Sequence, residues 1–336
     1  MSIKRLHLKD FTAFRSAEFE FAAGVNVFIG ANATGKTHVM KALYATLKAT
    51  EDKLSASGLD VRLKEKLARV FRPDDMNIGR LGHRVGAGHR SATVRVVDDD
   101  KREVAFTVYT RNAQLKVTKS SMREPPAPIF LPSREALAMY EGFIAAYQAR
   151  ELSFDETYFD LAVALSAAAV RGAKPPVITE VLKELESALG GKVSLTGDRF
   201  YVGTLEAHLV SEGMRKLASV VRLLTNNELR QRGVLFWDEP EANLNPQLSV
   251  IVARVLQRLA SEGIQVFVAT HDYLVAESLG LLATEADAPP MRFFSFTRAP
   301  GHEAVEVEGA SDLDDLERNL IREEFLRHYD RVRGAG

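Results

Sequence analysis

The alternation of apolar and polar residues predicts short strands and a helix near the N-terminus. Apolar residues alternate with polar ones at 3–8 and 17–21, and a compact apolar run at 26–29 leads into a glycine-rich loop. Alternation with a period of two predicts half-buried strands, whereas a short apolar run predicts a buried strand. Leucines then recur at helical spacing, so we expect a helix at 37–56.

The middle of the chain predicts an antiparallel meander followed by a largely helical region. The expected elements are a helix at 59–71, a mobile loop at 76–89, strands at 92–97, 103–110, 114–118 and 129–131, helical structure over 134–171 and a helix at 179–189. The first three of these strands alternate well enough to form a meander. Gly190 and Gly191 are expected to end the last of these helices.

The C-terminal part of the chain alternates strands with helices. The expected elements are two small strands at 192–195 and 199–202, a helix at 212–230, a strand at 233–237, a helix at 246–261, a strand at 265–269, a helix at 272–281, a strand at 292–297 and a charged helix at 313–333. Strands that alternate with helices imply a mainly parallel sheet covered by helices, which is an α/β fold.

The composition is that of an ordinary folded protein. Among the 336 residues, 46% are apolar and 26% are charged, which allows a large core. The chain has no cysteine, which excludes disulfides and thiolate metal sites and is consistent with a reducing compartment. The N-terminus lacks the apolar core of a signal peptide, and the longest apolar stretches are too short to cross a bilayer. We therefore expect a cytoplasmic protein with no membrane partner.

The charges are balanced overall but unevenly distributed. The formal net charge of −1 excludes a uniformly basic nucleic-acid-binding protein. Between Lys53 and Arg95, however, ten basic residues stand against four acidic ones, whereas the segment 303–333 has ten acidic and five basic residues. The basic segment 53–95 could contact the phosphates of DNA. The simpler interpretation is a solvated helix face followed by a loop.

A phosphate-binding motif lies between the predicted strand at 26–29 and the helix that follows it. Residues 30–37 read GANATGKT, which matches the pattern GxxxxGK[ST]. The two glycines permit a tight turn, and backbone N–H groups at the start of the helix can surround phosphates. Lys36 would reach the β- and γ-phosphates of ATP, and the hydroxyl of Thr37 would ligate Mg²⁺. The predicted nucleotide contacts are Gly30, Asn32, Ala33, Thr34, Gly35, Lys36, Thr37 and His38.

A pair of acids follows a second apolar strand. The segment 233–246 reads GVLFWDEPEANLNP, so that Asp238 and Glu239 stand where the strand ends. Ligands of open parallel sheets bind at the carboxyl ends of the strands. We therefore expect Asp238 to hold Mg²⁺ and Glu239 to orient and polarise the attacking water. A helix cap or a turn at Pro240 is the structural alternative.

His271 ends a third apolar strand. It follows the run QVFVAT and lies 32 residues beyond Glu239. A lone histidine is more often structural than catalytic. In this setting we expect it to contact the γ-phosphate and the attacking water, since a neutral imidazole can both donate and accept a hydrogen bond.

The order of phosphate loop, acid pair, ANLN segment and strand-terminal histidine resembles the ABC-type ATPase superfamily. Asn32 in the loop and the N-terminal pattern I-x-x-L-x-L-x-x-F resemble its RecF, SMC and OLD-nuclease branch rather than transporter subunits. The resemblance is dense at 1–45 and 205–280. It implies a P-loop fold with an antiparallel β lobe and a helical insertion. It also implies a homodimer or higher oligomer in which two heads enclose two ATP molecules.

The resemblance also identifies a signature segment at 210–216. Ser211 and Gly213 match the serine and glycine of the family, whereas Glu212 and Met214 depart from its pattern. In the family, this serine and the helix that follows it face the γ-phosphate bound by the other subunit. Asn243 matches the D-loop, which crosses the dimer interface in relatives. Without the resemblance, Ser211 would be an ordinary helix N-cap.

One element departs from the family pattern. A glutamine that senses Mg²⁺ should follow the strand at 129–131, but the sequence there reads PSRE. Either Ser133 or Glu135 replaces it, or water completes the coordination. The PSRE segment resembles a subgroup of stand-alone ATPases of prokaryotic defence systems, including those paired with nucleases or toxins. A nuclease or toxin effector is therefore an expected partner.

The resemblance implies one ABC-type ATPase domain over 1–336. Its expected parts are an N-terminal lobe at 1–131, a helical insertion at 133–190, a C-terminal lobe at 191–300 and a charged helix at 312–333. The insertion shows no sustained heptads of an SMC coiled coil. About 55 residues follow Leu281, so we do not expect the nuclease domain of OLD proteins in this sequence.

Three functions remain open from the sequence. The first is an ATPase whose ATP-driven dimerisation controls a partner effector or a nucleic acid, with anti-phage defence as the expected setting. The second is a RecF-like repair ATPase that binds DNA in the presence of ATP. The third, a transporter ATPase subunit, is disfavoured by the loop and signature departures.

Overall fold

A six-stranded sheet lies at the centre of the protein. In spatial order it contains β14 (Glu306–Ala310), β13 (Met291–Thr297), β3 (Val25–Gly30), β12 (Gln265–Thr270), β11 (Val234–Asp238) and β7 (Pro128–Leu131). All neighbours are parallel except β14, which pairs antiparallel with β13. The computed structural model describes residues 2–51, 57–83, 91–149, 152–229, 233–298 and 304–334. The mainly parallel α/β fold expected from the sequence is confirmed.

The two faces of the central sheet belong to two cores. Alternate residues of each strand point to opposite faces. Phe28, Phe236 and Phe267 join a core made mostly of residues from the first 130 positions, whereas Trp237 and Val268 join the core formed with the later helices. The three middle strands are therefore buried on both sides, which explains their continuous apolar sequences.

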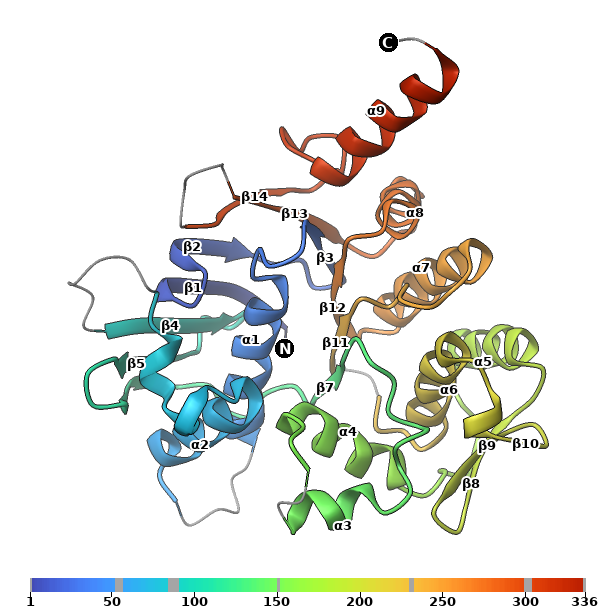
Figure 1. Ribbon diagram of the computed structural model, residues 1–336, viewed down its shortest axis with the longest axis horizontal. Coiled ribbons are helices and arrows are strands. Elements are labelled where there is room, and N and C mark those ends of the chain that lie inside the picture. The colour runs from blue at the N-terminus through green and yellow to red at the C-terminus, as the bar shows by residue number, and fades with distance from the viewer. Residues whose placement is uncertain are drawn as a thin grey trace.

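A five-stranded antiparallel sheet packs beside the central sheet (Figure 1). Its order is β2 (Phe14–Glu20), β1 (Ile3–Phe11), β4 (Ser91–Asp98), β5 (Glu103–Tyr109) and β6 (Gln114–Ser120). The rings of Phe19 and Phe28 both lie 5.5 Å from that of Phe294, so aromatic contacts join the two sheets. The expected meander is thus part of a larger sheet that includes the N-terminal hairpin.

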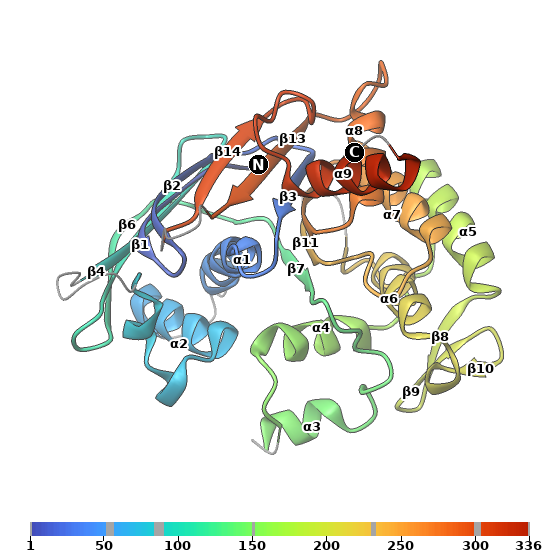
Figure 2. The same ribbon diagram turned by 45° about the horizontal axis from the view of Figure 1, so that its top comes forward.

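Helices cover both faces of the central sheet (Figures 1 and 2). On the side of the antiparallel sheet lie α1 (Lys36–Glu51) and α2 (Leu59–Phe71). The helices of the other core are α4 (Glu156–Ser166), α5 (Pro176–Leu189), α6 (Glu212–Thr225), α7 (Pro246–Ser261) and α8 (Tyr273–Ala283). Most of these helices begin and end within a few residues of the expected bounds.

The region 134–171 is less helical than expected. It contains only the short helix α3 (Phe143–Gln148) and α4, with turns or irregular backbone over the rest of the described part. Gly142 has a φ of +69°, which is outside the helical region, and it precedes α3. After α5 a small sheet follows, formed by β8 (Val193–Thr196), β9 (Arg199–Val202) and β10 (Leu205–Glu206).

Two helix bounds were wrong, and the described part of one expected loop contains a short 3₁₀ turn. The helix expected at 212–230 ends at Thr225, because the next residues form a turn. The helix expected at 313–333 begins only at Leu320, as α9 (Leu320–Arg333), where the Asn319 side chain accepts a hydrogen bond from the Arg322 N–H at 3.1 Å. The expected loop at 76–89 contains a 3₁₀ turn, η2 (Ile78–Leu81), and its residues 84–89 lie outside the described ones.

The C-terminal helix α9 extends away from the body of the protein (Figure 1). None of its residues is buried. Its first turns are held to α8 by Arg322, which bonds both carboxylate oxygens of Glu277 at 2.7 and 2.8 Å. Across the described residues, no helix is long and apolar enough to cross a membrane. The division of the chain into lobes stays a prediction.

Candidate nucleotide site

The phosphate loop connects β3 to α1 and requires glycine at both ends. A Cβ added to Gly30 would lie 2.5 Å from the carbonyl oxygen of Phe296. Gly35 has a φ of +91°, and a Cβ there would lie 2.8 Å from the ring of Phe14. No side chain fits either position, so the neighbouring strands hold the loop in one compact conformation. The N–H groups of the first turn of α1 face the loop, as anion binding requires.

The side chain of Lys36 runs under the loop. Its Nζ donates hydrogen bonds to the carbonyl oxygens of Gly30 and Ala31, at 2.6 and 2.9 Å. Burial lowers the pKa of Lys36, and the charges of Asp238, Glu239 and Glu241 partly oppose that shift. The Lys36 ammonium thus lies close to three carboxylates.

Thr37 and Asp238 meet although 201 residues separate them. The Thr37 hydroxyl donates a hydrogen bond to Oδ2 of Asp238 at 2.9 Å. Burial raises the pKa of Asp238 to about 6; the Thr37 bond opposes the shift, whereas the charge of Glu239 adds to it. A hydroxyl and a carboxylate are hard oxygen donors of the kind that Mg²⁺ prefers, so this pair fits a magnesium ion.

Glu239 and His271 also lie side by side, next to a third acid. Nδ1 of His271 is 3.3 Å from Oε1 of Glu239 and 3.7 Å from Oε1 of Glu241. Glu241 is buried, and its Oε1 accepts hydrogen bonds from the Thr270 hydroxyl and the His271 N–H, at 2.8 and 3.2 Å. Sequence reasoning missed Glu241, although it stands two residues beyond Glu239 in the same turn.

A cavity of about 410 Å³ lies over the phosphate loop. Its lining residues are Thr12, Ala13, Asn32, Ala33, Thr34, Gly35, Lys36, Thr37, His38, Glu239 and Arg298. The guanidinium of Arg298 donates a hydrogen bond to the Ala33 carbonyl at 3.2 Å. Sequence reasoning missed Thr12, Ala13 and Arg298. Arg298 follows the predicted strand at 292–297, so the argument used for Glu239 and His271 could have found it.

Ser211, Gly213 and Asn243 form a second cluster, here called the signature surface. None of the three lines the cavity over the phosphate loop. A Cβ added to Gly213 would lie 2.3 Å from the carbonyl oxygen of Asn243, so glycine permits close packing of these segments. Ser211 occupies the N-cap position of α6, yet its side chain makes no capping hydrogen bond. Ser211 and Asn243 are both exposed.

The residues after β7 do not reach the cavity. Oε1 of Glu135 lies 2.8 Å from Nε of Arg215 on α6, and Oε2 accepts a hydrogen bond from the Ala138 N–H at 3.1 Å. Neither Ser133 nor Glu135 lines the cavity. Glu135 is therefore engaged with α6, and the group that replaces the missing glutamine stays a prediction.

Two protein-family models match different parts of the chain. The model described as "AAA ATPase domain" matches residues 1–124, which include the phosphate loop. The model described as "AAA domain, putative AbiEii toxin, Type IV TA system" matches residues 134–277, which include the acids and His271.

Curated relatives match over shorter segments. The DNA replication and repair protein RecF of Streptococcus suis is 29% identical over 110 residues, covering 26% of this chain and 30% of that protein. RecF of Streptococcus uberis is 48% identical over 44 residues, covering 13% and 12%. The macrolide export ATP-binding/permease protein MacB of Syntrophobacter fumaroxidans is 32% identical over 146 residues, covering 40% and 18%. The chain thus spans less than a third of the length of these relatives.

Solved structures share the fold over nearly the whole chain. An SMC head bound to the C-winged helix domain of ScpA has a TM-score of 0.56 at 14% identity and covers 94% of this chain and 98% of that one. The SMC head of Pyrococcus furiosus, with an extended coiled coil and bound to the C-terminal domain of ScpA, has a TM-score of 0.55 at 13% identity and covers 99% of both chains. The chain thus has the fold of SMC heads, and two of its segments are similar to AAA ATPase domains. Together with the similarity to RecF, these findings support an ABC-type ATPase of the RecF/SMC branch.

Proposed function

We propose that this protein binds and hydrolyses ATP and that ATP closes two heads into a dimer. The observation that carries the proposal is the contact between Thr37 and Asp238. It joins the phosphate loop to the acid pair beside the cavity, which Thr37 and Glu239 both line. A glycine-rich turn without nucleotide would not need a buried lysine, a hydroxyl and two acids at the same place.

Each of these residues has a distinct role in this proposal. Lys36 and the N–H groups of the loop hold the β- and γ-phosphates, and the hydroxyl of Thr37 and the carboxylate of Asp238 hold Mg²⁺. Bound Mg²⁺ neutralises charge on the phosphates. Glu239 orients and polarises the attacking water, and His271 contacts the γ-phosphate beside it. Catalysis then consists of positioning and charge neutralisation.

The dimer is proposed from the signature surface. Ser211 and Asn243 are exposed outside the cavity of their own chain, and the hydroxyl of Ser211 is not used as a cap. A helix N-terminus with a free serine is suited to an anionic group of a second chain. The closed state would be favoured by the differential affinity of ATP for the two arrangements.

We further propose that dimerisation controls an effector of the nuclease or toxin class, in a cytoplasmic defence system. The PSRE segment at 132–135 supports this setting, and so does the family model whose description refers to a toxin. The chain has no cysteine, as expected for a reducing compartment. Pull-down with Glu239→Gln in ATP would identify the effector. Recovery of only ribosomal and abundant proteins would contradict this part.

The ATPase proposal is tested by turnover of Glu239→Gln. This variant keeps the shape of the side chain but loses the carboxylate, so we expect turnover to fall about 100-fold or more while ATP still binds. A matched control is Glu262→Gln, since Glu262 follows α7 and does not line the cavity. Unreduced phosphate release by Glu239→Gln would exclude Glu239 from this role.

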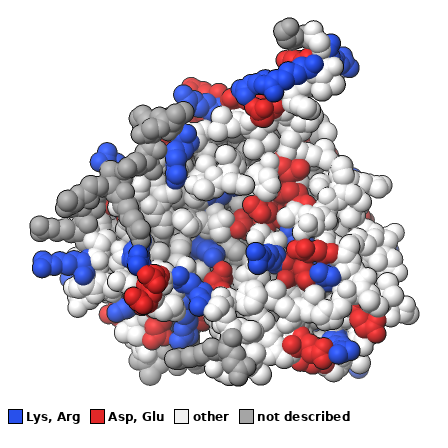
Figure 3. Space-filling model, viewed as in Figure 1, with Lys and Arg blue, Asp and Glu red and all other residues white. Residues whose placement is uncertain are grey.

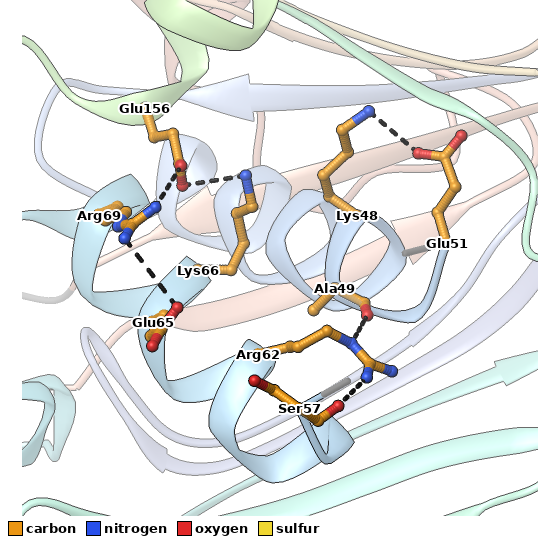
Figure 4. A pocket seen from close by; sticks show the side chains of 9 residues that line it. All are labelled: Lys48, Ala49, Glu51, Ser57, Arg62, Glu65, Lys66, Arg69 and Glu156. Carbon is orange, nitrogen blue, oxygen red and sulfur yellow. Dashed lines mark hydrogen bonds and ion pairs between the residues drawn. The ribbon is translucent and has the colours of Figure 1, made fainter. Parts of the chain in front are cut away.

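A RecF-like DNA-binding function is the second candidate, because RecF proteins are among the relatives. Figure 3 shows basic and acidic side chains interspersed on one face of the molecule. Within the segment 53–95, Lys66 and Arg69 pair with Glu156 at 2.9 and 3.3 Å, around a cavity between α1, α2 and α4 (Figure 4). Lys53, Arg84 and Arg90 lie outside the described residues.

These internal ion pairs make the DNA function the weaker candidate. Arg72 donates to the Phe154 carbonyl at 2.7 Å, and Arg80 and Arg95 pair with nearby acids. Basic groups that neutralise acids of the same chain attract phosphates less strongly. The DNA function requires ATP-dependent binding of DNA that weakens steeply with salt. Glu239→Gln with ATP at low salt is the sample in which to measure it.

A transporter subunit is the third candidate and has the least support. MacB is a relative, but the match covers 18% of that protein. Glu212 and Met214 depart from the signature of the superfamily in this chain. Partitioning of the expressed protein between membrane and supernatant fractions would separate this candidate from the other two.

A further inference from the structure

A buried lysine of α6 lies against the turn that carries Glu239. Lys216 is only 3% exposed, and its Nζ donates a hydrogen bond to the backbone carbonyl of Glu239 at 3.1 Å. Burial lowers the pKa of Lys216, and the charges of Glu241, Glu212, Glu239 and Asp238 oppose that shift. The acids of the site thus favour the charged ammonium that donates this bond.

The backbone of Glu239 needs such support. Its φ is +48°, in the left-handed region that residues with a Cβ disfavour by about 1–2 kcal/mol. A conformation of this kind persists only where the surroundings hold it. The N–H of Glu239 bonds to the Ala269 carbonyl of β12 at 2.8 Å, and its carbonyl accepts from Lys216 and, at 3.2 Å, from the Ala242 N–H. The hydrogen bond from Lys216 therefore links the backbone of Glu239 to α6.

The same helix contacts the same turn at a second point. Gly213 packs so closely on Asn243 that a Cβ would lie 2.3 Å from its carbonyl oxygen. Gly213 and Lys216 are three residues apart, and side chains at that spacing lie on one face of a helix. The start of α6 thus contacts the turn at 239–243 at two points, Gly213 on Asn243 and Lys216 on Glu239. We expect the helix start and the turn to move together when Ser211 is displaced.

We infer that Lys216 is a positioning residue that couples the signature surface to Glu239 of the same chain. The inference rests on the proposed function, in which Ser211 meets nucleotide held by a second chain and Glu239 acts on water. Engagement of Ser211 shifts the first turn of α6, and the Lys216 bond carries that shift to the Glu239 backbone. Hydrolysis in one cavity then depends on the nucleotide in the other. Lys216 itself does not line the cavity over the phosphate loop.

The test compares Lys216→Met with a control at the other end of α6. Lys174 also donates to backbone carbonyls of this helix, those of Leu224 and Thr225, at 2.8 and 3.2 Å. We expect Lys216→Met to lower kcat about 10-fold or more, with KM for ATP within about 2-fold of wild type. Lys174→Met should leave both constants within about 2-fold. Lys216→Arg, which keeps a cationic donor, should give a kcat between those of Lys216→Met and wild type.

A spectroscopic signal separates positioning from loss of structure. Trp237 is the only tryptophan of the chain, and with Lys216 it lines a small cavity behind the acids. An unchanged Trp237 emission maximum in the variant without ATP would show an intact core. We expect ATP to change the Trp237 emission of wild type, and this change should be reduced in Lys216→Met and kept in Lys174→Met. Should Lys216→Met fail to fold, Lys216→Arg decides by the same kcat-against-KM comparison.

The outcomes separate this inference from the proposed function. A wild-type protein that neither hydrolyses ATP nor dimerises would overturn the proposed function. A wild-type protein that does both, with a Lys216→Met variant of unchanged kcat, would overturn the coupling alone. An equal loss of kcat in Lys216→Met and Lys174→Met would also overturn it, because both effects would then reflect a weaker α6.

Discussion

The cavity over the phosphate loop and the signature surface are built in opposite ways. In the cavity, polar groups are bonded within the chain: Lys36 to the loop carbonyls and Thr37 to Asp238. On the signature surface, Ser211 and Asn243 are exposed, and the Ser211 side chain does not cap its helix. Folding of one chain therefore assembles the first region. The second is left with groups that a second chain could use.

The largest expected effect is on ATP affinity and comes from removing the Lys36 ammonium. We expect Lys36→Ala to weaken ATP binding on the order of 100-fold, because the charge-assisted bonds to the phosphates are lost. Lys48→Ala is the control on the same helix, since Lys48 pairs with Glu51 near its other end. Titration with a fluorescent ATP analogue measures both. Equal affinities for the two variants would contradict the assignment of the cavity.

The next effect concerns the packing beneath the signature surface. Alanine for glycine inside a helix ordinarily adds up to about 1 kcal/mol of stability. At Gly213 the new Cβ would meet the Asn243 carbonyl, so we expect Gly213→Ala to lower the free energy of unfolding by about 1–3 kcal/mol. At Gly58 a Cβ would meet only the movable carboxylate of Asp60. Urea unfolding should leave Gly58→Ala within about 0.5 kcal/mol of wild type.

The buried carboxyl of Asp238 predicts a pH-dependent stability. Because the pKa of Asp238 is raised to about 6, the protonated carboxyl is favoured in the folded state. Its contribution to the free energy of unfolding is complete below pH 4 and is lost as the pH rises through 6. Without Mg²⁺ and nucleotide, Asp238→Asn should therefore be more stable than wild type at pH 8, by about 2–3 kcal/mol relative to their difference at pH 4. Thermal unfolding at both pH values measures this. A constant difference would mean that Asp238 ionises normally.

The smallest effect on stability is expected for Ser211→Ala. This variant tests most sharply whether the signature surface differs from the cavity. Because the side chain makes no capping bond, Ser211→Ala should change the free energy of unfolding by less than about 0.5 kcal/mol. Asn245 is the matched control, because its side chain accepts a bond from the Leu248 N–H at 2.9 Å and caps α7. Asn245→Ala should cost about 1 kcal/mol. Ser211→Ala should nevertheless lower turnover, which a simple cap would not do.

The sequence predicted the parts of the site that lie where strands end. The phosphate loop, Asp238, Glu239 and His271 each follow an apolar run, and parallel strands bring their carboxyl ends to one edge. The same reasoning extends to Arg298. It could not find Thr12 and Ala13, because they belong to a hairpin of the other sheet and reach the cavity only by packing between sheets.

The structure corrected predictions that rested on local sequence signals alone. Helical residues such as alanine and leucine fill 134–171, but Gly142 has a φ of +69° and the helices there are short. The edge strand β14 was missed, since its sequence EVEGA is acidic and forms a strand only by pairing with β13. Lys216 was included in the signature segment, but its role was missed because it depends on a contact across 23 residues of sequence.

The central claim is that the signature surface completes the cavity of a second chain. The measurement that tests it most directly is the solution mass of Glu239→Gln with and without Mg-ATP, by light scattering. We expect the 37.2 kDa chain without nucleotide and twice that mass with it. Adding Ser211→Arg, which places a bulky side chain on the signature surface, should return the mass to that of one chain while ATP still binds. A mass of one chain in saturating ATP would contradict the account. A dimer whose mass changes neither with ATP nor with Ser211→Arg would also contradict it.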